Sequence, residues 1–210
     1  EPLAEYLASL RGPGSSREIP FKLRPRPTSD EATSLVMTEY DLPRGGEFEL
    51  FMVRGDERHV WPHDVIVDDQ YAYYTDHFSN ALGRVDKNTG EAIEIAYPIP
   101  PGGGRETNMM PGEVRAGNPG GGSHDLAFDS HGNVIIGMDG ATVRYNPNTE
   151  AFDSWTSGNA MFGIDPNNHI WHPGDDGVLV EIDTESGEIS EHAIATSDGD
   201  YGIDTDSQGR

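Results

Sequence analysis

The stretch Val85-Asp86-Lys87-Asn88-Thr89-Gly90-Glu91 (VDKNTGE) decides the fold, because two similar stretches follow it along the chain. They are Tyr145-Asn146-Pro147-Asn148-Thr149-Glu150-Ala151 and Ile182-Asp183-Thr184-Glu185-Ser186-Gly187-Glu188. Each copy has an apolar residue, Asp or Asn, two polar residues, and then Thr or Ser. This pattern is typical of a strand that ends in a tight turn closed by Asx and Ser/Thr side chains. A repeat of about 40 residues indicates an array of small β units.

Each copy is preceded by two further strand patterns with a polar turn between them, and it is followed by a last short strand. Four short strands in each unit match the blade of a β-propeller. We therefore predict an all-β fold, a β-propeller of four-stranded blades. The paired stretches are residues 63–68 and 71–75, 124–129 and 133–136, and 162–165 and 169–171.

The chain carries three full units and the beginning of a fourth at Tyr201, whereas propellers commonly have 4–8 blades. We therefore expect residues 34–210 to be a partial propeller of about three to four blades. Residues 34–43 (SLVMTEYDLP) resemble the last strand of a unit. We expect them to pair with the final blade where the ring closes, which leaves an exposed edge here.

Residues 1–33 follow a different pattern. The apolar residues at positions 3, 6, 7 and 10 have helical spacing, so we predict a helix over residues 1–13 and an extended linker over 14–33. A helix this short is marginal alone in water, so we expect it to pack on an upstream domain. The segment LAEYLASLRGP resembles the C-terminal helix of a class I cytochrome c. That resemblance implies haem only in the upstream domain, since this chain has no cysteine for haem attachment.

Charge and composition limit the partners of the chain. There are 37 acidic against 14 basic residues, a net charge of −23, which repels phosphate backbones and argues against nucleic-acid binding. No stretch approaches the roughly 18 apolar residues of a membrane span. The lack of cysteine excludes thiolate metal ligands and cysteine nucleophiles in these residues. We expect a monomeric protein that is periplasmic or secreted.

The first unit contains Trp61-Pro62-His63-Asp64-Val65, Tyr73-Tyr74-Thr75-Asp76 and Leu82-Gly83-Arg84-Val85-Asp86, and it ends in Tyr97-Pro98-Ile99-Pro100. These stretches resemble one repeat of the streptogramin B lyase (virginiamycin B lyase) family, over about residues 34–210. The resemblance implies a seven-bladed propeller, a carbon–oxygen lyase that opens a cyclic depsipeptide by Mg²⁺-assisted β-elimination. It also implies that His63 and His124 act as acid and base, and that Asp76 lies at the family's acidic position.

The dipeptides His63-Asp64 and His124-Asp125 stand where the family has His-Gly, and the third and fourth units have no histidine there. Because they occupy matching places in two blades, they put two imidazoles and two carboxylates around one channel mouth. One hypothesis is a hard-cation site for Mg²⁺ at Asp64, Asp125 and Asp76, with His63 and His124 as acid and base. The alternative is that these side chains hydrogen-bond the backbone of the neighbouring blade.

Two further residues are candidates for substrate binding. Trp61 is a candidate platform, although aromatic residues at regular places in a repeat more often fill the core. Arg115 belongs to a long insertion, residues 101–123, and such loops on a rigid scaffold often carry binding. His77 and His172 are weaker candidates, and His77 is expected in a solvated loop.

Three functions remain open at this point. The first is the lyase activity described above. The second is a non-catalytic propeller that binds a small molecule, a peptide or a protein in its central channel, attached to a cytochrome c domain. A sugar-lactone hydrolase is the third, and it needs Glu and Asn metal ligands that the sequence does not place.

Overall fold

The computed structural model describes residues 36–43, 62–77, 79–98, 100, 123–138, 140–159, 161–175, 177–194 and 202–206. The chain divides into two units, Glu1–Glu39 and Tyr40–Arg210, and every strand among the described residues belongs to the second. The predicted helix over 1–13, the linker over 14–33, Trp61 and Arg115 lie outside the described residues.

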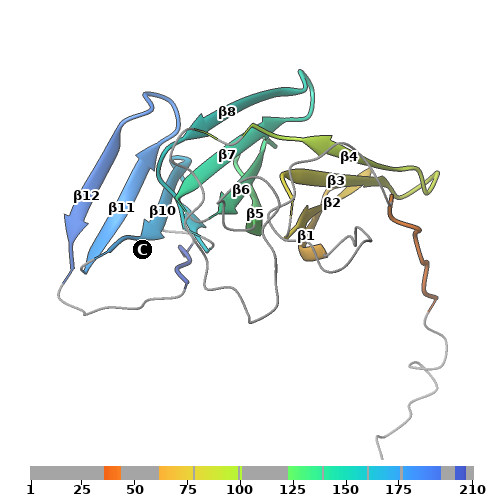
Figure 1. The fold of residues 1–210 in the computed structure, drawn as a ribbon, viewed down its shortest axis with the longest axis horizontal. Helices are drawn as coiled ribbons and strands as arrows, with labels where there is room; N and C mark the ends of the chain where they lie inside the picture. Colours follow the sequence, from red (N-terminus) through yellow and green to blue (C-terminus); the bar gives the residue numbers. More distant parts are fainter. Residues whose placement is uncertain are drawn as a thin grey trace, which may run out of the picture. The chain divides into compact units, whose positions relative to one another are not determined.

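Three antiparallel sheets of four strands each form the described part of the second unit (Figure 1). Neighbours in each sheet are neighbours in the chain, which confirms the predicted all-β propeller blades. The first blade contains β1 (Pro62–Val67), β2 (Tyr71–Asp76), β3 (Ala81–Asp86) and β4 (Ala92–Ala96). The second contains β5 (Ser123–Phe128), β6 (Val134–Met138), β7 (Ala141–Asn146) and β8 (Ala151–Trp155). The third contains β9 (Gly163–Ile164), β10 (His169–Pro173), β11 (Val178–Asp183) and β12 (Ile189–Ala193).

The repeated stretch forms the turn between the two outer strands of every blade. In the first blade the Oδ1 atom of Asp86 accepts the backbone N–H groups of Asn88 (2.8 Å) and Thr89 (3.1 Å). Asn146 and Asp183 accept the matching pairs of N–H groups in the second and third blades. The turns therefore close through the side chains that the sequence pattern predicted.

One position in these turns requires a left-handed backbone. Gly90 and Gly187 have φ angles of 78° and 77°, which glycine adopts without steric cost. Glu150 takes the same place in the second blade with a φ of 55°. The second repeat therefore keeps the turn although its glycine is replaced.

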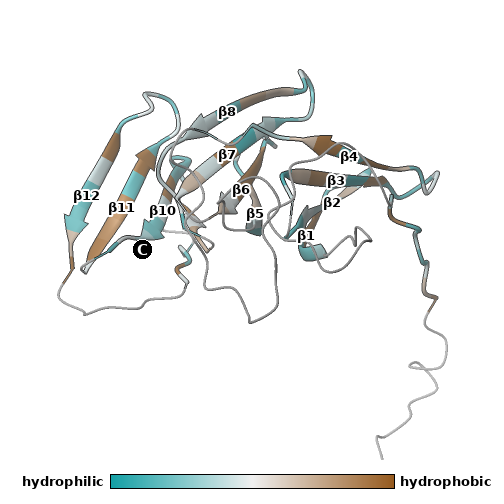
Figure 2. Cartoon of the chain, in the orientation of Figure 1, coloured by the Kyte–Doolittle hydropathy of each residue, from teal (hydrophilic) through white to brown (hydrophobic). Residues whose placement is uncertain are grey.

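Apolar side chains pack neighbouring blades against each other, and Figure 2 shows hydrophobic segments along the strands with hydrophilic turns between them. Each fully buried large side chain contributes about 1.5–3 kcal/mol, so these contacts stabilise the array from blade to blade. The cluster between the first and second blades contains Tyr73, Leu82, Tyr97, Leu126, Val134, Ile136, Met138, Ala141, Val143 and Tyr145. The cluster between the second and third contains Ile135, Trp155, Phe162, Ile170 and Ile182.

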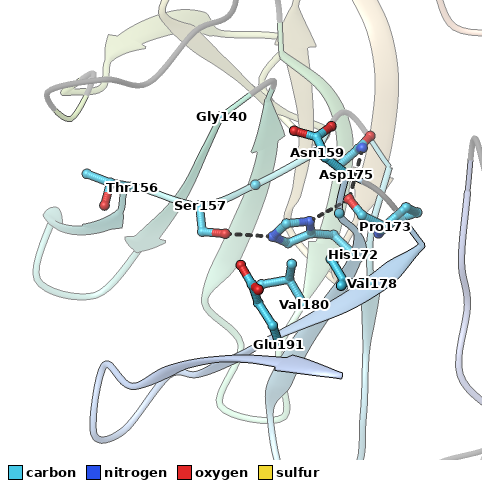
Figure 3. A pocket seen from close by; sticks show the side chains of 12 residues that line it. Gly140, Thr156, Ser157, Asn159, His172, Pro173, Asp175, Val178, Val180 and Glu191 are labelled. Atoms are coloured by element: carbon cyan, nitrogen blue, oxygen red, sulfur yellow. Dashed lines mark hydrogen bonds between the residues drawn. The ribbon is translucent and has the colours of Figure 1, made fainter. Parts of the chain in front are cut away.

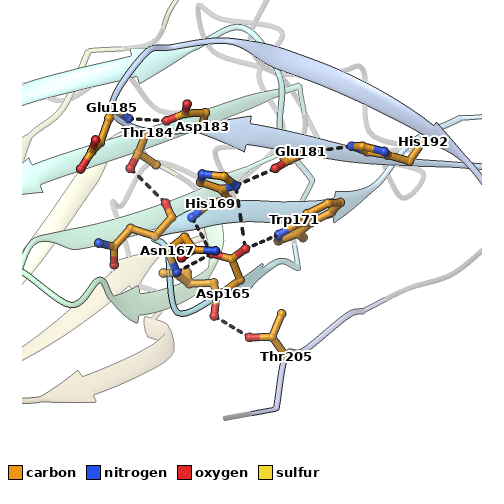
Figure 4. Close-up of polar contacts among 12 residues, drawn as sticks. Asp165, Asn167, His169, Trp171, Glu181, Asp183, Thr184, Glu185, His192 and Thr205 are labelled. Carbon is orange, nitrogen blue, oxygen red and sulfur yellow. Dashed lines mark hydrogen bonds and ion pairs between the residues drawn. The ribbon is translucent and has the colours of Figure 1, made fainter. Parts of the chain in front are cut away.

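The third blade carries a polar cluster on its sheet (Figure 4). The two carboxylate oxygens of Glu181 contact His169 Nδ1 at 2.6 Å and His192 Nε2 at 2.7 Å. Asp165, in the turn before β10, accepts the backbone N–H of His169 at 2.9 Å and the indole N–H of Trp171 at 3.3 Å. These contacts tie β10, β11 and β12 to one another.

Residues 36–43 form no strand, so the predicted last strand over 34–43 is absent from its described part. Val36 and Met37 are 90% and 81% exposed. In the second unit, the hydroxyl of Tyr40 instead donates to the carbonyl of Lys87 at 3.1 Å. No helix long and apolar enough to cross a membrane occurs among the described residues.

Candidate functional site

The candidate functional side chains gather at one end of the blades, which we name the mouth end. Strands alternate in direction, so the inner strands β1, β5 and β9 begin at the end where the second strands β2, β6 and β10 finish. The outer strands β4 and β8 also finish there. Residues that begin an inner strand, end a second strand or follow an outer strand therefore share this end.

Three histidines form a cluster at the mouth end, between the first and second blades. His63 lies near the start of β1, His77 directly follows β2, and His124 lies near the start of β5. The ring centroids of His63 and His124 are 4.2 Å apart, those of His77 and His124 are 4.3 Å apart, and those of His63 and His77 are 5.0 Å apart. One ring nitrogen from each histidine lies within 4.8 Å of the other two.

Burial, followed by the smaller effects of the neighbouring rings of His77 and His63, lowers the pKa of His124 to about 4. The Nδ1 atom of His124 is buried and has no hydrogen-bonding partner among the described residues. His77 Nδ1 lies 3.2 Å from the carbonyl oxygen of Ser123, which only accepts, so this nitrogen is the donor.

The two aspartates that follow His63 and His124 connect successive blades. Asp64 Oδ2 accepts the backbone N–H of Leu126 in the second blade at 3.1 Å. Asp125 Oδ2 accepts the backbone N–H of Phe162, before the third blade's inner strand, at 3.4 Å. The sequence left open whether these carboxylates bind a cation or the neighbouring backbone, and the structure shows the backbone contacts.

The carboxyl groups of Asp64 and Asp125 also interact with each other. Burial, followed by the hydrogen bond with the Asp64 carboxyl, raises the pKa of Asp125 to about 6.

Asp76, the third predicted metal ligand, is 1% exposed at the end of β2. Its Oδ2 atom accepts the hydroxyl of Ser79 at 2.8 Å, and its backbone carbonyl accepts the hydroxyl of Ser123 at 3.2 Å. The neighbouring Thr75 links the same two blades: its Oγ1 accepts the N–H of Asp64 at 3.2 Å and donates to the carbonyl of His124 at 3.0 Å. These buried contacts fix the backbone that carries the histidines.

The Mg²⁺ ion that the lyase resemblance implies does not fit this arrangement. Mg²⁺ takes oxygen ligands in an octahedral shell. The side chains that converge here are three imidazoles, and the carboxylates of Asp64, Asp125 and Asp76 accept hydrogen bonds from the protein. A role of these carboxylates as Mg²⁺ ligands stays a prediction.

A cavity of about 380 Å³ lies at the mouth end between the second and third blades (Figure 3). His172 Nδ1 lies 2.9 Å from the carbonyl of Pro173, which only accepts, so Nδ1 carries the proton. The Nε2 atom therefore accepts the hydroxyl of Ser157, at 2.9 Å. The amide of Asn159 and the acidic side chains of Asp175 and Glu191 complete the polar lining.

Comparisons with known proteins do not assign the chain to a family. No protein-family model matches it, and neither does any curated protein, so the resemblance to streptogramin B lyases stays a prediction. Among solved structures it is similar to extracellular domains from B. thetaiotaomicron. One, of BT4673, is named as part of a one-component system, with 16% identity and a TM-score of 0.46 over 63% of this chain and 16% of that chain.

A second solved structure, of BT3049, is named as part of a hybrid two-component system, with 16% identity and a TM-score of 0.41. That alignment covers 75% of this chain and 17% of the other. A further structure of BT4673, named there as a hybrid two-component system, has 14% identity and a TM-score of 0.43 over 64% of this chain and 18% of that chain. The chain thus spans about a sixth of these proteins.

The structure places the predicted site residues in three groups. His63 and His124 lie side by side, Asp64 and Asp125 lie at the blade junctions, and Asp76 is buried below them. His77 completes the histidine cluster, although the sequence indicated only a solvated loop there. His77 directly follows β2 and lies opposite the start of the next inner strand, β5. This position identifies His77 as part of the cluster once the alignment of neighbouring blades is known. Ser157 carries no repeat signal, because it lies in a connection between blades.

Proposed function

We propose that this protein is a ligand-binding β-propeller, located in the periplasm or secreted, that takes a small polar ligand at the mouth end of its blades. The observation that carries the proposal is the cavity between the second and third blades. Its volume of about 380 Å³ lies in the range of small-molecule sites, roughly 300–1,000 Å³. Its lining combines two hydroxyls, of Thr156 and Ser157, with an imidazole, an amide and two carboxylates.

The lining favours a ligand that carries both hydroxyl groups and a positive charge. Ser157 donates its proton to His172, so its oxygen is left as an acceptor for a ligand hydroxyl. Asp175 and Glu191 are exposed carboxylates at the same cavity, and they attract a cation. A hexosamine has this combination of groups, whereas a neutral hexose lacks the charge.

Calorimetric titration of the purified chain with glucosamine and with glucose tests the proposal. We expect glucosamine to bind at least about fivefold more tightly, because an exposed ion pair contributes up to about 1 kcal/mol. Glu191→Gln is expected to remove that preference, and Ser157→Ala to weaken both sugars. Glu188→Gln, which changes an exposed acid in the turn of the same blade, serves as the matched control. Binding of neither sugar, or a preference indifferent to Glu191→Gln, would contradict the proposal.

A second candidate, β-elimination on an ester of a cyclic depsipeptide, is favoured by one observation. The Asp64–Asp125 pair, with the pKa of Asp125 raised to about 6 by burial, supplies a group that exchanges protons beside His63 and His124. Incubation of a streptogramin B with the protein, followed by mass spectrometry, distinguishes the reactions. Elimination yields a linear product of unchanged mass, hydrolysis adds one water, and an unchanged ring with every divalent ion rejects both.

The location is tested separately. The strongly acidic composition supports a place outside the cytoplasm but does not identify the compartment. Fractionation of cells that produce the full-length protein is expected to recover it from the periplasm or the medium. Recovery from the cytoplasm would reject this part of the proposal and leave the ligand cavity unaffected.

A further inference from the structure

We propose that His63, His77 and His124 form a binding site for a divalent transition-metal ion, with Zn²⁺ as the expected ion. The site is distinct from the ligand cavity between the second and third blades, and it uses different residues. The three rings converge, and the backbone of two blades holds them together.

The geometry of the cluster is close to that of a three-histidine metal site. Zn²⁺ binds imidazole nitrogens at about 2.0–2.1 Å, so tetrahedral ligands lie about 3.3 Å apart. The ring nitrogens here lie within 4.8 Å of one another without an ion. Rotation of the side chains closes the remaining gap, and His63 is exposed and free of packing on one side.

Two contacts of the histidines suit a metal site. His77 Nδ1 lies 3.2 Å from the carbonyl of Ser123, a contact of the kind that orients metal-bound histidines. His124 Nδ1 is buried without a hydrogen-bonding partner among the described residues. A bound ion would give this nitrogen a partner.

Hydrogen bonds next to the three histidines hold the first and second blades in a fixed register. Thr75 bridges the N–H of Asp64 and the carbonyl of His124, and the hydroxyl of Ser123 donates to the carbonyl of Asp76. Both bridges lie next to the histidines, and the contact between Ser123 and Asp76 is buried. Three ligands from two blades are thereby presented together before an ion arrives, which lowers the ordering cost of binding.

The donor set decides the class of ion. Imidazole suits Zn²⁺, Cu²⁺, Ni²⁺ and Fe²⁺, whereas Mg²⁺ and Ca²⁺ require oxygen. Three protein ligands leave at least one coordination position of a tetrahedral ion for water or for a ligand. The site therefore has the composition of an open metal centre, in which a bound molecule can contact the ion.

Calorimetric titration of the full chain, without a histidine tag and after dialysis against a chelator, tests the proposal. We expect one Zn²⁺ per chain with a Kd of about 1 µM or tighter, and no binding of Mg²⁺ under the same conditions. His77→Ala is expected to weaken Zn²⁺ by roughly 100-fold, since losing a ligand costs at least as much as losing its supporting contacts. His192→Ala, in the Glu181 cluster of the third blade, is the matched control and is expected to leave affinity unchanged.

Co²⁺ absorption of the unmodified protein provides a readout that needs no variant. Co²⁺ bound by three imidazoles in a four-coordinate site gives intense visible bands, whereas Co²⁺ on surface carboxylates stays weakly coloured and octahedral. His77→Gln is a second variant in case His77→Ala does not fold. The proposal is overturned if no stoichiometric Zn²⁺ binds, if binding is indifferent to both His77 variants, or if Mg²⁺ binds equally well. Such a failure leaves the Glu191-dependent sugar binding intact, so the two proposals are separable.

Discussion

Asp64 of the first blade accepts the backbone N–H of Leu126 in the second blade at 3.1 Å, and the same contact recurs one blade further on. There Asp125 accepts the N–H of Phe162, which precedes the inner strand of the third blade. The aspartates occupy matching positions in the repeat, and so do Leu126 and Phe162, which donate the N–H groups. The same residue in two successive blades thus makes the same hydrogen bond to the next blade. The bond from Leu126 to Asp64 sets the distance between His63 and His124.

The blade connection predicts the effect of replacing Asp64. Asp64→Ala removes one of the two acceptors of the N–H of Leu126, the other being Asp125 Oδ1 at 3.1 Å, and is expected to lower the free energy of unfolding by about 1 kcal/mol. Asp64→Asn keeps an oxygen in place and is expected to cost less than half as much. Urea denaturation of the three proteins measures both changes. Equal losses for Ala and Asn would show that the acceptor oxygen is not what matters.

Thr75 is expected to act as a positioning residue for the histidines. It is fully buried and bridges Asp64 and His124, so Thr75→Val keeps the shape and removes both hydrogen bonds. We expect a stability loss of about 1–2 kcal/mol and a roughly tenfold weaker Zn²⁺ affinity. Thr75→Ser retains the hydroxyl and is expected to restore the affinity. A Val variant that loses stability but binds Zn²⁺ normally would limit Thr75 to a structural role.

Gly83 is expected to tolerate no side chain, because the ring of Tyr74 lies directly over it. A Cβ atom at Gly83 would lie 1.9 Å from Cζ of Tyr74, and Tyr74 is 4% exposed. Gly83→Ala is therefore expected to destabilise the first blade by about 2–3 kcal/mol. In a Tyr74→Ala background the same change is expected to cost much less. Gly202→Ala is the control, since the nearest atom to its added Cβ is 3.6 Å away; similar costs at both glycines would reject the packing argument.

The turn of the third blade predicts a specific pH dependence. The hydrogen bond from the Ser186 hydroxyl, followed by the N–H groups of Glu185 and Ser186, lowers the pKa of Asp183 from 3.8 to about 2. The folded pKa lies below the unfolded one, so this turn's stabilisation is present above about pH 4. It is lost as pH falls through about 2.

Carboxyl NMR titration measures the pKa of Asp183 directly. Ser186→Ala is expected to move it back toward 3.8, because the largest contributor is removed. Asp183→Asn is expected to abolish the pH dependence while keeping the turn, since Asn146 closes the same turn in the second blade. An unchanged pKa in Ser186→Ala would contradict the assigned cause.

The repeat predicted the fold because its signal is local. The turn around Asp86 is closed by contacts within a few residues, and the same contacts recur at Asn146 and Asp183. Because the hydrogen bonds of the turn lie within the repeated stretch itself, the stretch identifies the blade without knowledge of distant contacts. Residues 36–43 form no strand here, and their pairing with a final blade stays a prediction, because a strand depends on a partner that a local pattern does not identify.

The candidate site was predictable only in part, for a related reason. His63 and His124 are marked by the repeat, and the structure places their rings 4.2 Å apart. His77 joins them through the register between β2 and β5, and a single sequence does not state which residues meet across blades. Asp64 and Asp125 accept backbone N–H groups of the next blade, contacts that depend on the positions of Leu126 and Phe162, and their role as cation ligands stays a prediction. Ser157 meets His172 across a blade junction in the same way.

The measurement that tests the metal centre most directly is X-ray diffraction from crystals of the chain soaked in Zn²⁺, with data collected on both sides of the zinc absorption edge. If the three histidines bind Zn²⁺, we expect an anomalous peak within about 2.0–2.1 Å of a ring nitrogen from each of His63, His77 and His124. A crystal with no peak at these three histidines, or with its strongest peak between His169, Glu181 and His192, would contradict it.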